Sequence, residues 1–528
     1  MPLKPLGDSA WLVEFPRETP PERVTGLVAA LAKNRPARVL DVVPSFDSLA
    51  VHFDGADGVE VGKWIEAALS ADADFEPNAG AEFTIPVCYD GPDLEEVAAQ
   101  TGLSVEAVIA LHSGADYTVA AVGFSPGFPY LSGLPDRLNV PRRKTPRLSV
   151  PAGSVAIAGG QAGIYPFASP GGWHVLGRTG TTLFDPANAR PALLQAGDRV
   201  RFVPVESIEF PEKQPSPTAG LTTRWIEVLH PGGLTTVQDL GRPGHEASGV
   251  SPGGAADRHS LRLANLLVGN DEGAAALEIC LSGPVLKFHV DAVVAIVDGE
   301  GKPRRVKAGD VVDFSKLKNG VRACLAVAGG VRVPSVLGSA ATDLRAGFGG
   351  LSGRPLQAGD RLEIGEAGRV PAGSDWHVGR VTRDARIELR FLPGVQQEWF
   401  SDEAQRCFRT ETYQLTPRSD RMGARLSGDR LDLENPREMV SQPVACGSVQ
   451  VPPDGQPIVL LAERQTIGGY PQIGHVISVD LPKLARAWPG TWVKFREVTW
   501  EEAQELKRRE ERDFAWLRTG LELLKSKP

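Results

Sequence analysis

The phrase Ala196-Gly-Asp-Arg-Val-Arg-Phe202 is the stretch that decides the fold, because variants of it recur further along the chain. The variants are Ala308-Gly-Asp-Val-Val-Asp-Phe314, Ala358-Gly-Asp-Arg-Leu-Glu-Ile364 and, more loosely, Pro489-Gly-Thr-Trp-Val-Lys-Phe495. Each joins a glycine turn to a run in which apolar and polar residues alternate, the pattern of a half-buried strand. Recurrence of one strand entry predicts a protein built from repeated β units.

The composition agrees with many short strands. The 58 glycines and 43 prolines stand between apolar runs and form no low-complexity tract, which is typical of tight turns between strands. The 528 residues predict three or four packed units, because a typical domain has about 150 residues. The 57 basic and 65 acidic side chains give a formal charge of −8 without a long basic block, so we expect no nucleic acid partner.

The five cysteines are scattered and form no CxxC pair: Cys88, Cys280, Cys324, Cys407 and Cys446. We therefore expect neither a disulfide framework nor structural zinc, and we assign no metal ligand. No segment approaches 18 consecutive apolar residues, and residues 1–15 lack the pattern of an export signal. The expectation is a cytoplasmic protein without a membrane partner.

Hydrophobic periodicity and turn signals divide the chain into four parts. Residues 1–82 alternate strand-like and helix-like runs, which predicts a small α/β domain. Residues 83–206 begin with a strand and two short helices and then become β-rich, and the proline-rich residues 207–223 predict a linker. From residue 224 onward the chain is again β-rich. Two helices are expected in this last part: Asp257–Val268 and Thr499–Leu524.

A second internal echo involves two polar loops. They are Val150-Pro-Ala-Gly-Ser with Gln161 and Tyr165-Pro166, and Val451-Pro-Pro-Asp-Gly with Gln465 and Tyr470-Pro471. The echo predicts two related barrels that each carry one equivalent loop. Repeated barrel architecture alone explains the Ala-Gly-Asp phrases, whereas Gln and Tyr beside glycine-rich backbone offer hydrogen-bonding groups that folding does not require.

Longer phrases carry a resemblance to known families. The first half contains Gly7-Asp-Ser-Ala-Trp-Leu-Val-Glu-Phe15, Gly123-Phe-Ser-Pro-Gly-Phe-Pro-Tyr-Leu131 and Ser169-Pro-Gly-Gly-Trp-His-Val-Leu-Gly-Arg-Thr179, and it resembles the allophanate hydrolase subunit 1 (KipI-type) family. The second half contains Thr236-Val-Gln-Asp-Leu-Gly-Arg-Pro-Gly244, Thr342-Asp-Leu-Arg-Ala-Gly347 and Ser419-Asp-Arg-Met-Gly423, and it resembles the allophanate hydrolase subunit 2 (KipA-type) family. The whole chain is therefore similar to a fusion of the B and C subunits of 5-oxoprolinase.

The resemblance implies a mainly β fold with α+β character, in which cyclophilin-like β-barrel domains follow the small N-terminal α/β domain. It places one barrel at 83–206, a second at 224–385 and a third, with the C-terminal helix, at 386–528. It also implies ATP and Mg as cofactors, although the sequence contains no GxxxxGK[ST] phosphate loop. The implied partners are an A-type 5-oxoprolinase protein and a small-molecule amide, and a homo-oligomer is a further expectation.

The relatives suggest three functions. The first is a component of ATP-dependent 5-oxoprolinase, which activates the lactam of 5-oxoproline for hydrolysis to glutamate. The second is a biotin-dependent carboxyltransferase acting on urea or a related amide, and the third is a KipI/KipA-like regulator of a histidine kinase. The chain itself should carry no covalent biotin, because none of its methionines (Met1, Met422 and Met439) lies beside a lysine.

Six side chains are candidate catalytic groups: His112, Gln161, Tyr165, His174, Gln465 and Tyr470. Each glutamine carries a donor and an acceptor that suit an amide edge, and a tyrosine hydroxyl follows four or five residues later. His174 follows Trp173, and an imidazole that titrates near pH 6.5 suits a general base. The alternatives are a structural role for His174 and a helix C-terminal cap for His112.

The candidate substrate-binding residues are glycines, arginines, acids and the residues of the GFSPG phrase: Phe124, Ser125, Gly127, Gly160, Gly171, Gly172, Arg178, Asp239, Asp257, Glu278, Arg345, Asp420, Arg421, Gly468 and Gly469. Glycine-rich loops can bring backbone N–H groups close to an amide or a phosphate, and the alternative is a tight hairpin. Arginine can hold a carboxylate or phosphate through two parallel hydrogen bonds, or form an ion pair on a barrel rim. The acids could hold a metal-nucleotide or accept a proton, or act only in turns.

Overall fold

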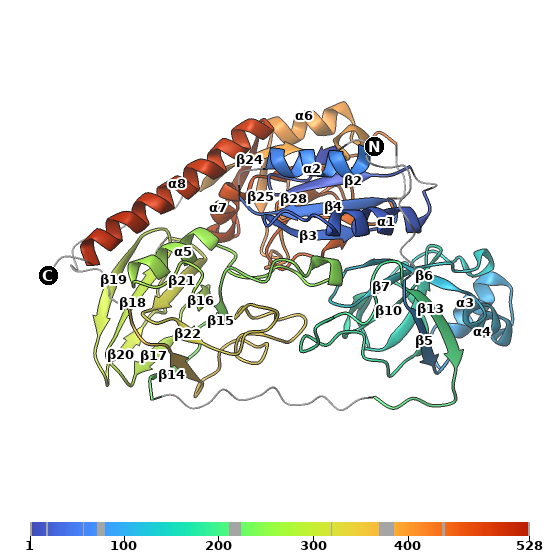
Figure 1. Ribbon diagram of the computed structural model, residues 1–528, viewed down its shortest axis with the longest axis horizontal. Helices are drawn as coiled ribbons and strands as arrows, with labels where there is room; N and C mark the ends of the chain where they lie inside the picture. Colours follow the sequence, from blue (N-terminus) through green and yellow to red (C-terminus); the bar gives the residue numbers. More distant parts are fainter. Residues whose placement is uncertain are drawn as a thin grey trace.

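The computed structural model describes residues 3–16, 19–55, 58–70, 80–210, 223–317, 319–368, 385–435 and 439–525. Most of the expected linker at 207–223 lies outside these residues. Figure 1 shows the N-terminal domain (blue) beside the C-terminal barrel and its long helix (orange to red). The first barrel (teal) and a middle β body (green to yellow) lie apart on the two sides of this unit.

The N-terminal domain is an antiparallel sheet of order β1-β2-β4-β3 with two helices. Its elements are β1 (Leu3–Pro5), β2 (Ala10–Glu14), α1 (Pro21–Ala32), β3 (Val39–Pro44), β4 (Ser48–Phe53) and α2 (Gly58–Ser70). Apolar residues of both helices, including Leu27 and Ile65, pack on the sheet around Leu49. The sequence pattern predicts all of these elements except β1, which is too short to show an alternation.

The first barrel is a seven-stranded sheet of order β12-β9-β10-β7-β6-β13-β5. Its two edge strands meet through the Cys88–Arg178 bridge, so the sheet is nearly closed. The helices expected at its start are present, and Ser104 caps the second of them by accepting a hydrogen bond from the N–H of Ala107. The elements are β5 (Glu82–Val87), α3 (Leu94–Thr101), α4 (Val105–Ser113), β6 (Tyr117–Val122), β7 (Pro129–Ser132), η1 (Asp136–Leu138), β8 (Arg147–Val150), β9 (Ser154–Ala158), β10 (Gln161–Ile164), β11 (Ser169–Gly171), β12 (His174–Arg178) and β13 (Arg199–Pro204).

The middle body consists of two five-stranded sheets that share one core, with Leu286 on one sheet and Leu325 on the other. The expected helix is α5, and Asp257 is its N-cap. The elements are β14 (Trp225–His230), β15 (Leu234–Gln238), η2 (Glu246–Ser248), α5 (Arg258–Leu267), β16 (Ala276–Cys280), β17 (Val285–Phe288), β18 (Ala292–Val297), β19 (Gly301–Val306), β20 (Val311–Asp313), β21 (Arg322–Val327), β22 (Val331–Arg332) and β23 (Arg361–Ile364).

The C-terminal part is a closed barrel of order β24-β31-β28-β29-β26-β25-β32 followed by helix α8. Helices α6 and α7 were not predicted, because both are short and interrupt a β-rich pattern. The elements are β24 (Arg386–Pro393), η3 (Gln397–Trp399), α6 (Asp402–Thr410), β25 (Thr412–Leu415), β26 (Gly423–Ser427), β27 (Gln442–Pro443), β28 (Ser448–Gln450), β29 (Ile458–Leu460), β30 (Ile467–Gly468), β31 (Gln472–Val476), η4 (Ser478–Asp480), α7 (Leu481–Arg486), β32 (Trp492–Glu497) and α8 (Trp500–Lys525). The mainly β fold class is confirmed.

The repeated Ala-Gly-Asp phrases are turns that lead into strands β13, β20 and β23. Their glycines, Gly197, Gly309 and Gly359, have φ angles of 93°, 92° and 87°. Only glycine adopts this left-handed conformation without strain. In each turn the Asp carboxylate accepts a hydrogen bond from the backbone N–H three residues earlier, at 2.8, 2.8 and 2.7 Å. The phrase is therefore a local structural motif. This agrees with the interpretation that repeated barrel architecture alone explains its recurrence.

The first and C-terminal barrels share one topology. When the sheet order is read from β12 in the first barrel and from β31 in the C-terminal barrel, the strands of the two barrels correspond one to one. In each barrel the strand that comes first in the chain pairs in parallel with the strand that comes last, β5 with β13 and β24 with β32. In this comparison β10, which begins at Gln161, corresponds to β29. Gln465 lies beyond β29, before β30, so the two glutamine loops are not equivalent. The prediction of an equivalent loop is wrong because a short Gln and Tyr-Pro phrase can recur outside the repeated strand order.

The N-terminal domain packs on the C-terminal part, although the two are far apart in sequence. The ring centroids of Trp11 and Trp500 lie 4.6 Å apart. The carboxylate of Asp8 accepts hydrogen bonds from the N–H and hydroxyl of Ser478 at 2.9 and 2.7 Å, and Gln504 donates to the Asp8 carbonyl. The first turns of helix α8 therefore contact the N-terminal domain, and the rest of the helix runs away from it (Figure 1).

Candidate functional site

Two cavities lie at the seam, defined here as the surface between residues 3–210 and residues 223–525. The larger has a volume of about 370 Å³, within the usual range for small-molecule sites. It is lined by Phe46, Asp47, Ser132, Gly159, Gly160, Gln161 and Val440. The smaller has a volume of about 10 Å³, enough for one water, and is lined by Phe124, Ser125, Pro126, Gly249, Ser251, Asp343, Arg345 and Glu463. Both halves of the chain contribute to each cavity.

The larger cavity contains the Gln161 hairpin. The turn between β9 and β10 consists of Gly159 and Gly160, with φ angles of 55° and 74°, as a two-residue hairpin turn of this kind requires. Gln161 follows at the start of β10, and its side chain is partly exposed. The cavity therefore combines an amide side chain, glycine backbone and the ring of Phe46.

An aromatic cluster lies between the two cavities. The ring of Tyr130 lies 6.0 Å from Phe46 of the larger cavity and 5.0 Å from Phe128. The ring of Phe128 lies 5.4 Å from Phe124 of the smaller cavity. Burial raises the pKa of Tyr130 to about 12, while the nearby Arg142 and Arg345 oppose that rise. Tyr130 thus carries a neutral hydroxyl group, and its aromatic neighbours connect it to the lining of both cavities.

Close backbone contacts build the smaller cavity. Phe124 has a φ of 66°, a strained value for a residue with a side chain. Gly249 approaches so closely that a Cβ there would lie 2.5 Å from the carbonyl oxygen of Ser125. Gly127 donates its N–H to the carbonyl of Ser248 at 2.9 Å. The Ser125 hydroxyl, buried at this junction, has no hydrogen-bond partner among the described residues.

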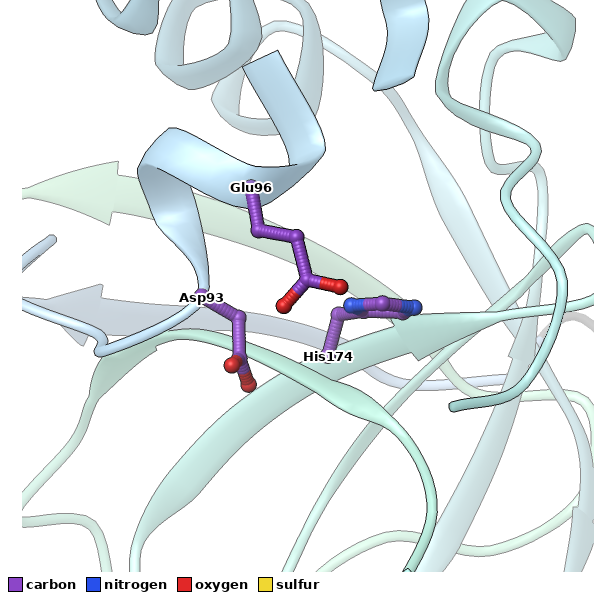
Figure 2. A group of neighbouring side chains, drawn as sticks. All are labelled: Asp93, Glu96 and His174. Atoms are coloured by element: carbon purple, nitrogen blue, oxygen red, sulfur yellow. The ribbon is translucent and has the colours of Figure 1, made fainter. Parts of the chain in front are cut away.

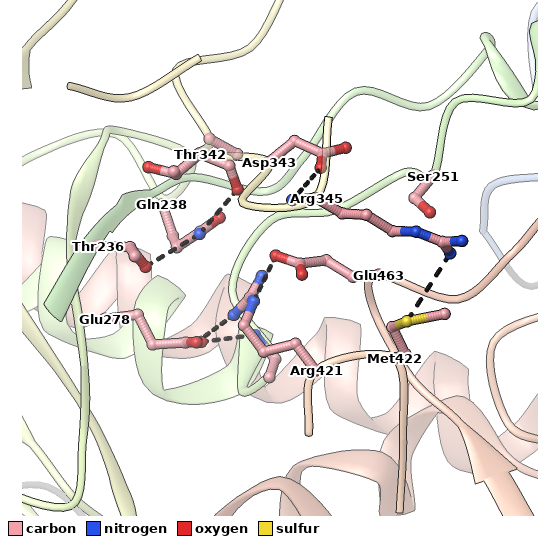
Figure 3. Close-up of polar contacts among 12 residues, drawn as sticks. Thr236, Gln238, Ser251, Glu278, Thr342, Asp343, Arg345, Arg421, Met422 and Glu463 are labelled. Atoms are coloured by element: carbon pink, nitrogen blue, oxygen red, sulfur yellow. Dashed lines mark hydrogen bonds and ion pairs between the residues drawn. The ribbon is translucent and has the colours of Figure 1, made fainter. Parts of the chain in front are cut away.

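Arg345 brings a positive charge to this cavity. Its guanidinium carbon lies 4.8 Å from the ring centroid of Phe124, a cation–π distance. Its side-chain hydrogen bond goes to the sulfur of Met422 at 3.8 Å (Figure 3). Within the described ranges, no carboxylate forms an ion pair with Arg345. Burial lowers the pKa of its guanidinium, and the nearby Asp343 opposes that effect.

A buried chain of charges lies beside Arg345 (Figure 3). The guanidinium of Arg421 donates to Glu463 at 2.6 Å, to Glu278 and to the carbonyl of Gly254 at 2.6 Å. Glu278 also accepts the N–H of Ala256 at 2.6 Å. Burial raises the pKa of Glu463 despite the pairing with Arg421. Arg421 and Glu278 thus form ion pairs with protein groups, and Glu463 is the member that lines the cavity.

A second buried network crosses the seam. Arg464, next to Glu463, donates to Glu246 at 2.7 Å, and Glu246 lies 3.5 Å from Nε2 of His52. Asp41 accepts the N–H of Ala247 at 3.0 Å. Burial raises the pKa of Asp41 and lowers that of His52. The network connects the N-terminal domain, the turn that leads to Gly249, and the segment that carries Glu463.

His174 lies apart from both cavities. His174 and Asp93 are buried and Glu96 is exposed, and one ligand atom of each lies within 4.8 Å of the others (Figure 2). Arg143 bridges Asp93 and Glu96 at 2.6 and 2.7 Å, and Arg147 holds both oxygens of Asp93. Because these arginines already occupy the carboxylates, we assign no metal to this cluster. The arrangement supports the structural alternative for His174.

His112 and Arg178 also lie away from the cavities. His112 is fully buried, shares a 2.8 Å hydrogen bond with the Tyr89 hydroxyl, and stacks on Phe202 with ring centroids 4.7 Å apart. Burial lowers the pKa of His112 to about 3, and its side chain caps no helix. Arg178 forms an exposed ion pair with Asp90. These contacts favour structural roles for both residues.

The remaining candidates divide between the seam and local turns. Tyr165 is buried against Gly171, Gly172 lies beside Pro146, and Gln465 donates to Gln450 at 3.3 Å. Gly468 packs on Gln450, Gly469 lies beside Ser441, and Tyr470 is exposed. Asp239, Asp257 and Asp420 accept backbone N–H groups in loops or at a helix start. Gln465 does not line either cavity, so the structure does not bring it together with Gln161.

Sequence reasoning missed several residues that line the seam. Asp343 stands beside Arg345 in a phrase that carries the family resemblance, and Ser251 precedes a pair of glycines, so a local signal existed for both. Glu463 and Phe46 gave no local signal, because only the fold brings them to the seam.

No helix in the described part of the chain is both long and apolar enough to cross a membrane.

Comparisons with known proteins match both halves. The family described as carboxyltransferase domain, subdomain C and D, matches residues 1–194, and subdomain A and B matches residues 248–497. The C subunit of 5-oxoprolinase from Haemophilus influenzae is 38% identical over 298 residues, which cover 54% of this chain and 95% of the relative. The B subunit of 5-oxoprolinase from Bacillus subtilis is 41% identical over 228 residues, 39% of this chain and 94% of the relative. The crystal structure of TTHA0988 is similar with a TM-score of 0.82 and 37% identity, over 92% of this chain and 99% of that one.

Proposed function

We propose, from the premise that this chain belongs to the carboxyltransferase domain family and joins its C–D and A–B subdomains, that it is a fused B and C component of a 5-oxoprolinase. In this proposal the lactam of 5-oxoproline binds at the seam. Opening of the lactam to glutamate then requires a separate A-type protein.

The observation that carries the proposal is the shared lining of the seam. Gln161 and Val440 line one cavity from opposite halves, and Ser125 and Glu463 do the same in the other. The relatives of the two halves are the separate B and C subunits of one named enzyme. A cavity that needs both halves gives a physical reason why the two proteins act together.

The chemistry of Gln161 suits a lactam. A lactam is a cis amide, so its N–H donor and C=O acceptor lie on one edge. The Gln161 side chain carries a matching acceptor and donor on its own edge, which allows two parallel hydrogen bonds. The bond from the Gln161 amide N–H to the lactam oxygen would stabilise negative charge that develops there on activation. Phe46 offers an apolar wall for the ring methylenes.

ATP and Mg belong to the proposal as requirements of the complete reaction. The lining of the larger cavity does not fit a triphosphate, because Asp47 is the one charged side chain among its lining residues and would repel the phosphates. We therefore derive no step through ATP, and we expect the nucleotide to need surfaces supplied by the A-type protein.

The test is to mix the chain with 5-oxoproline, ATP and Mg, with and without an A-type protein, and to measure ADP and glutamate. Glutamate should form only when both polypeptides are present. A Gln161→Leu variant should lose most of this activity, whereas Gln100→Leu, at an exposed position on α3, should keep it. Absence of substrate-dependent ADP in both mixtures would refute the proposal.

The family description supports a second candidate, because both matches are carboxyltransferase domains. Urea presents the same donor and acceptor edge as a lactam, so Gln161 would suit it equally. This candidate predicts consumption of carboxybiotin when urea is added. Consumption of carboxybiotin without any ADP from 5-oxoproline would favour it over the first.

A further inference from the structure

The larger cavity contains a second polar side chain beside Gln161, the hydroxyl of Ser132. Strands β7 and β10 pair in antiparallel register, with Ala162 opposite Leu131 (Figure 1). One step along the same register, Gln161 at the start of β10 lies opposite Ser132 at the end of β7. Side chains at directly opposite positions lie on the same face of a sheet, with Cβ atoms about 4.5–5.5 Å apart. Both residues line the larger cavity, so they present two polar groups to one ligand.

The alternation of the two strands explains why these side chains face the cavity. Ala162 and Leu131 are fully buried in the core of the first barrel. Their neighbours on each strand therefore point to the opposite, outer face of the barrel. The cavity on this face is completed by Phe46 and Val440, which belong to other parts of the chain.

Gln161 and Ser132 are the two side chains of the cavity lining that can donate a hydrogen bond. The other lining residues are apolar side chains, glycines and the acidic Asp47. The Ser132 hydroxyl donates to the backbone carbonyl of Thr118 at 3.1 Å, which is long for a hydroxyl donor. A serine hydroxyl rotates to suit its surroundings. Turning it toward a ligand therefore gives up one weak internal hydrogen bond.

The oxygen of a lactam has two lone pairs, and the Gln161 amide can fill only one of them. In the proposed binding mode, the Gln161 N–H approaches the lactam oxygen along the edge that carries the lactam N–H. The second lone pair lies on the other side of the oxygen. A donor on the neighbouring strand is placed to reach it, and Ser132 is that donor.

We propose that Ser132 is a catalytic residue of this cavity, which donates to the lactam oxygen together with Gln161. This inference rests on the proposed function. Negative charge grows on the lactam oxygen as the lactam is activated, and fixed donors stabilise that charge. The Ser132 bond is therefore stronger in the activated state than in the bound ground state, and its loss should lower kcat more than ligand affinity.

The test combines two measurements on the full chain. The first is the rate of glutamate formation with the A-type protein, 5-oxoproline, ATP and Mg. The second is titration calorimetry with 2-pyrrolidinone, the same lactam ring without the carboxylate. Ser132→Ala should lower kcat on the order of 100-fold. It should leave the 2-pyrrolidinone affinity within about threefold, because in the ground state Ser132 exchanges one neutral hydrogen bond for another.

Two further variants control for packing. Ser132→Thr keeps the hydroxyl and should retain most of the activity. Ser149→Ala removes an exposed hydroxyl from the same barrel and should change neither measurement. Because Ser132 is only partly buried and its internal hydrogen bond is weak, we expect Ser132→Ala to fold normally.

Each contrary outcome has a distinct meaning. A kcat of Ser132→Ala within about threefold of the unmodified chain would overturn the inference and leave the proposed function standing. Equal losses in Ser132→Ala and Ser132→Thr would show a packing role, and equal losses of kcat and 2-pyrrolidinone affinity would show a ground-state contact; either result overturns the inference. If the unmodified chain forms no glutamate with the A-type protein, the proposed function itself fails, which separates that failure from the others.

Discussion

Removal of the buried cation Arg464 should destabilise the chain, because Arg464 belongs to the buried network at the seam. Arg464 and Glu246 are 2% and 3% exposed, and Asp41 is buried nearby. An Arg464→Met substitution keeps most of the side-chain volume but leaves the buried Glu246 carboxylate without its cation. Loss of one partner of a buried ion pair costs about 3–5 kcal/mol, whereas an exposed pair contributes about 0–1 kcal/mol. We therefore expect a loss of about 3–5 kcal/mol in the free energy of unfolding.

Urea unfolding followed by tryptophan fluorescence measures this loss, because Trp11 and Trp500 report on the contact between the N-terminal domain and helix α8. Arg430→Met is the matched control, since Arg430 pairs with Asp432 at the surface. Adding Glu246→Gln to Arg464→Met should recover part of the stability, because it removes a buried charge that has lost its partner. The reasoning is refuted if Arg464→Met costs no more than Arg430→Met.

Three further outcomes are expected. Gly249→Ala should destabilise the chain by about 1–3 kcal/mol in thermal unfolding, because the new Cβ would meet the Ser125 carbonyl. The control is Gly309→Ala, which has open space around it and should cost only the strain of its positive φ, about 1 kcal/mol. The pKa of His112 is about 3 in the folded chain and about 6.5 in the unfolded chain. Between pH 3 and pH 6.5 the His112 imidazole is therefore protonated in the unfolded chain and neutral in the folded chain. The unfolding free energy should accordingly fall as pH drops from about 6.5 toward about 3, and His112→Phe should make a pH series of urea midpoints flatter. Gln161→Leu should weaken 2-pyrrolidinone binding by about three- to tenfold in calorimetry, because two neutral hydrogen bonds are lost, and an unchanged affinity would contradict the amide-edge pairing.

Local sequence signals predicted the turns and helix starts whose stabilising contacts join residues close together in the sequence. The Ala-Gly-Asp turns depend on one glycine with positive φ and one aspartate that bonds to a nearby N–H, so the phrase itself contains the whole motif. Helices α4 and α5 likewise begin at capping residues that can be read directly, Ser104 and Asp257. Helix α6 also begins at a capping residue, Ser401, but this short helix interrupts a β-rich pattern and was not predicted.

The site was predicted less well because it depends on pairing between distant segments. Arg345 and Ser125 were named from their phrases, but Glu463 and Phe46 reach the seam only through the closed fold. The supposed equivalence of Gln161 and Gln465 failed for the same reason: strand order decides which loops correspond, and a repeated phrase does not reveal strand order. His174 illustrates the opposite error, since a histidine in a glycine-rich loop suggested catalysis while its neighbours Arg143 and Arg147 build an ion-pair cluster.

The contacts across the seam explain how one chain can replace two separate proteins. The relatives of its halves are individual polypeptides, so the covalent link is not what holds such halves together. In this chain the Asp8–Ser478 bonds, the hydrogen bond from the Ala247 N–H to Asp41 and the Trp11–Trp500 contact join the halves independently of the segment between them. The Glu246–Arg464 pair also fixes the residues next to Gly249 and Glu463, which line the smaller cavity. Association of the halves and formation of the cavity are therefore one event, and any change that loosens the seam should be felt at Arg345 before the barrels themselves unfold.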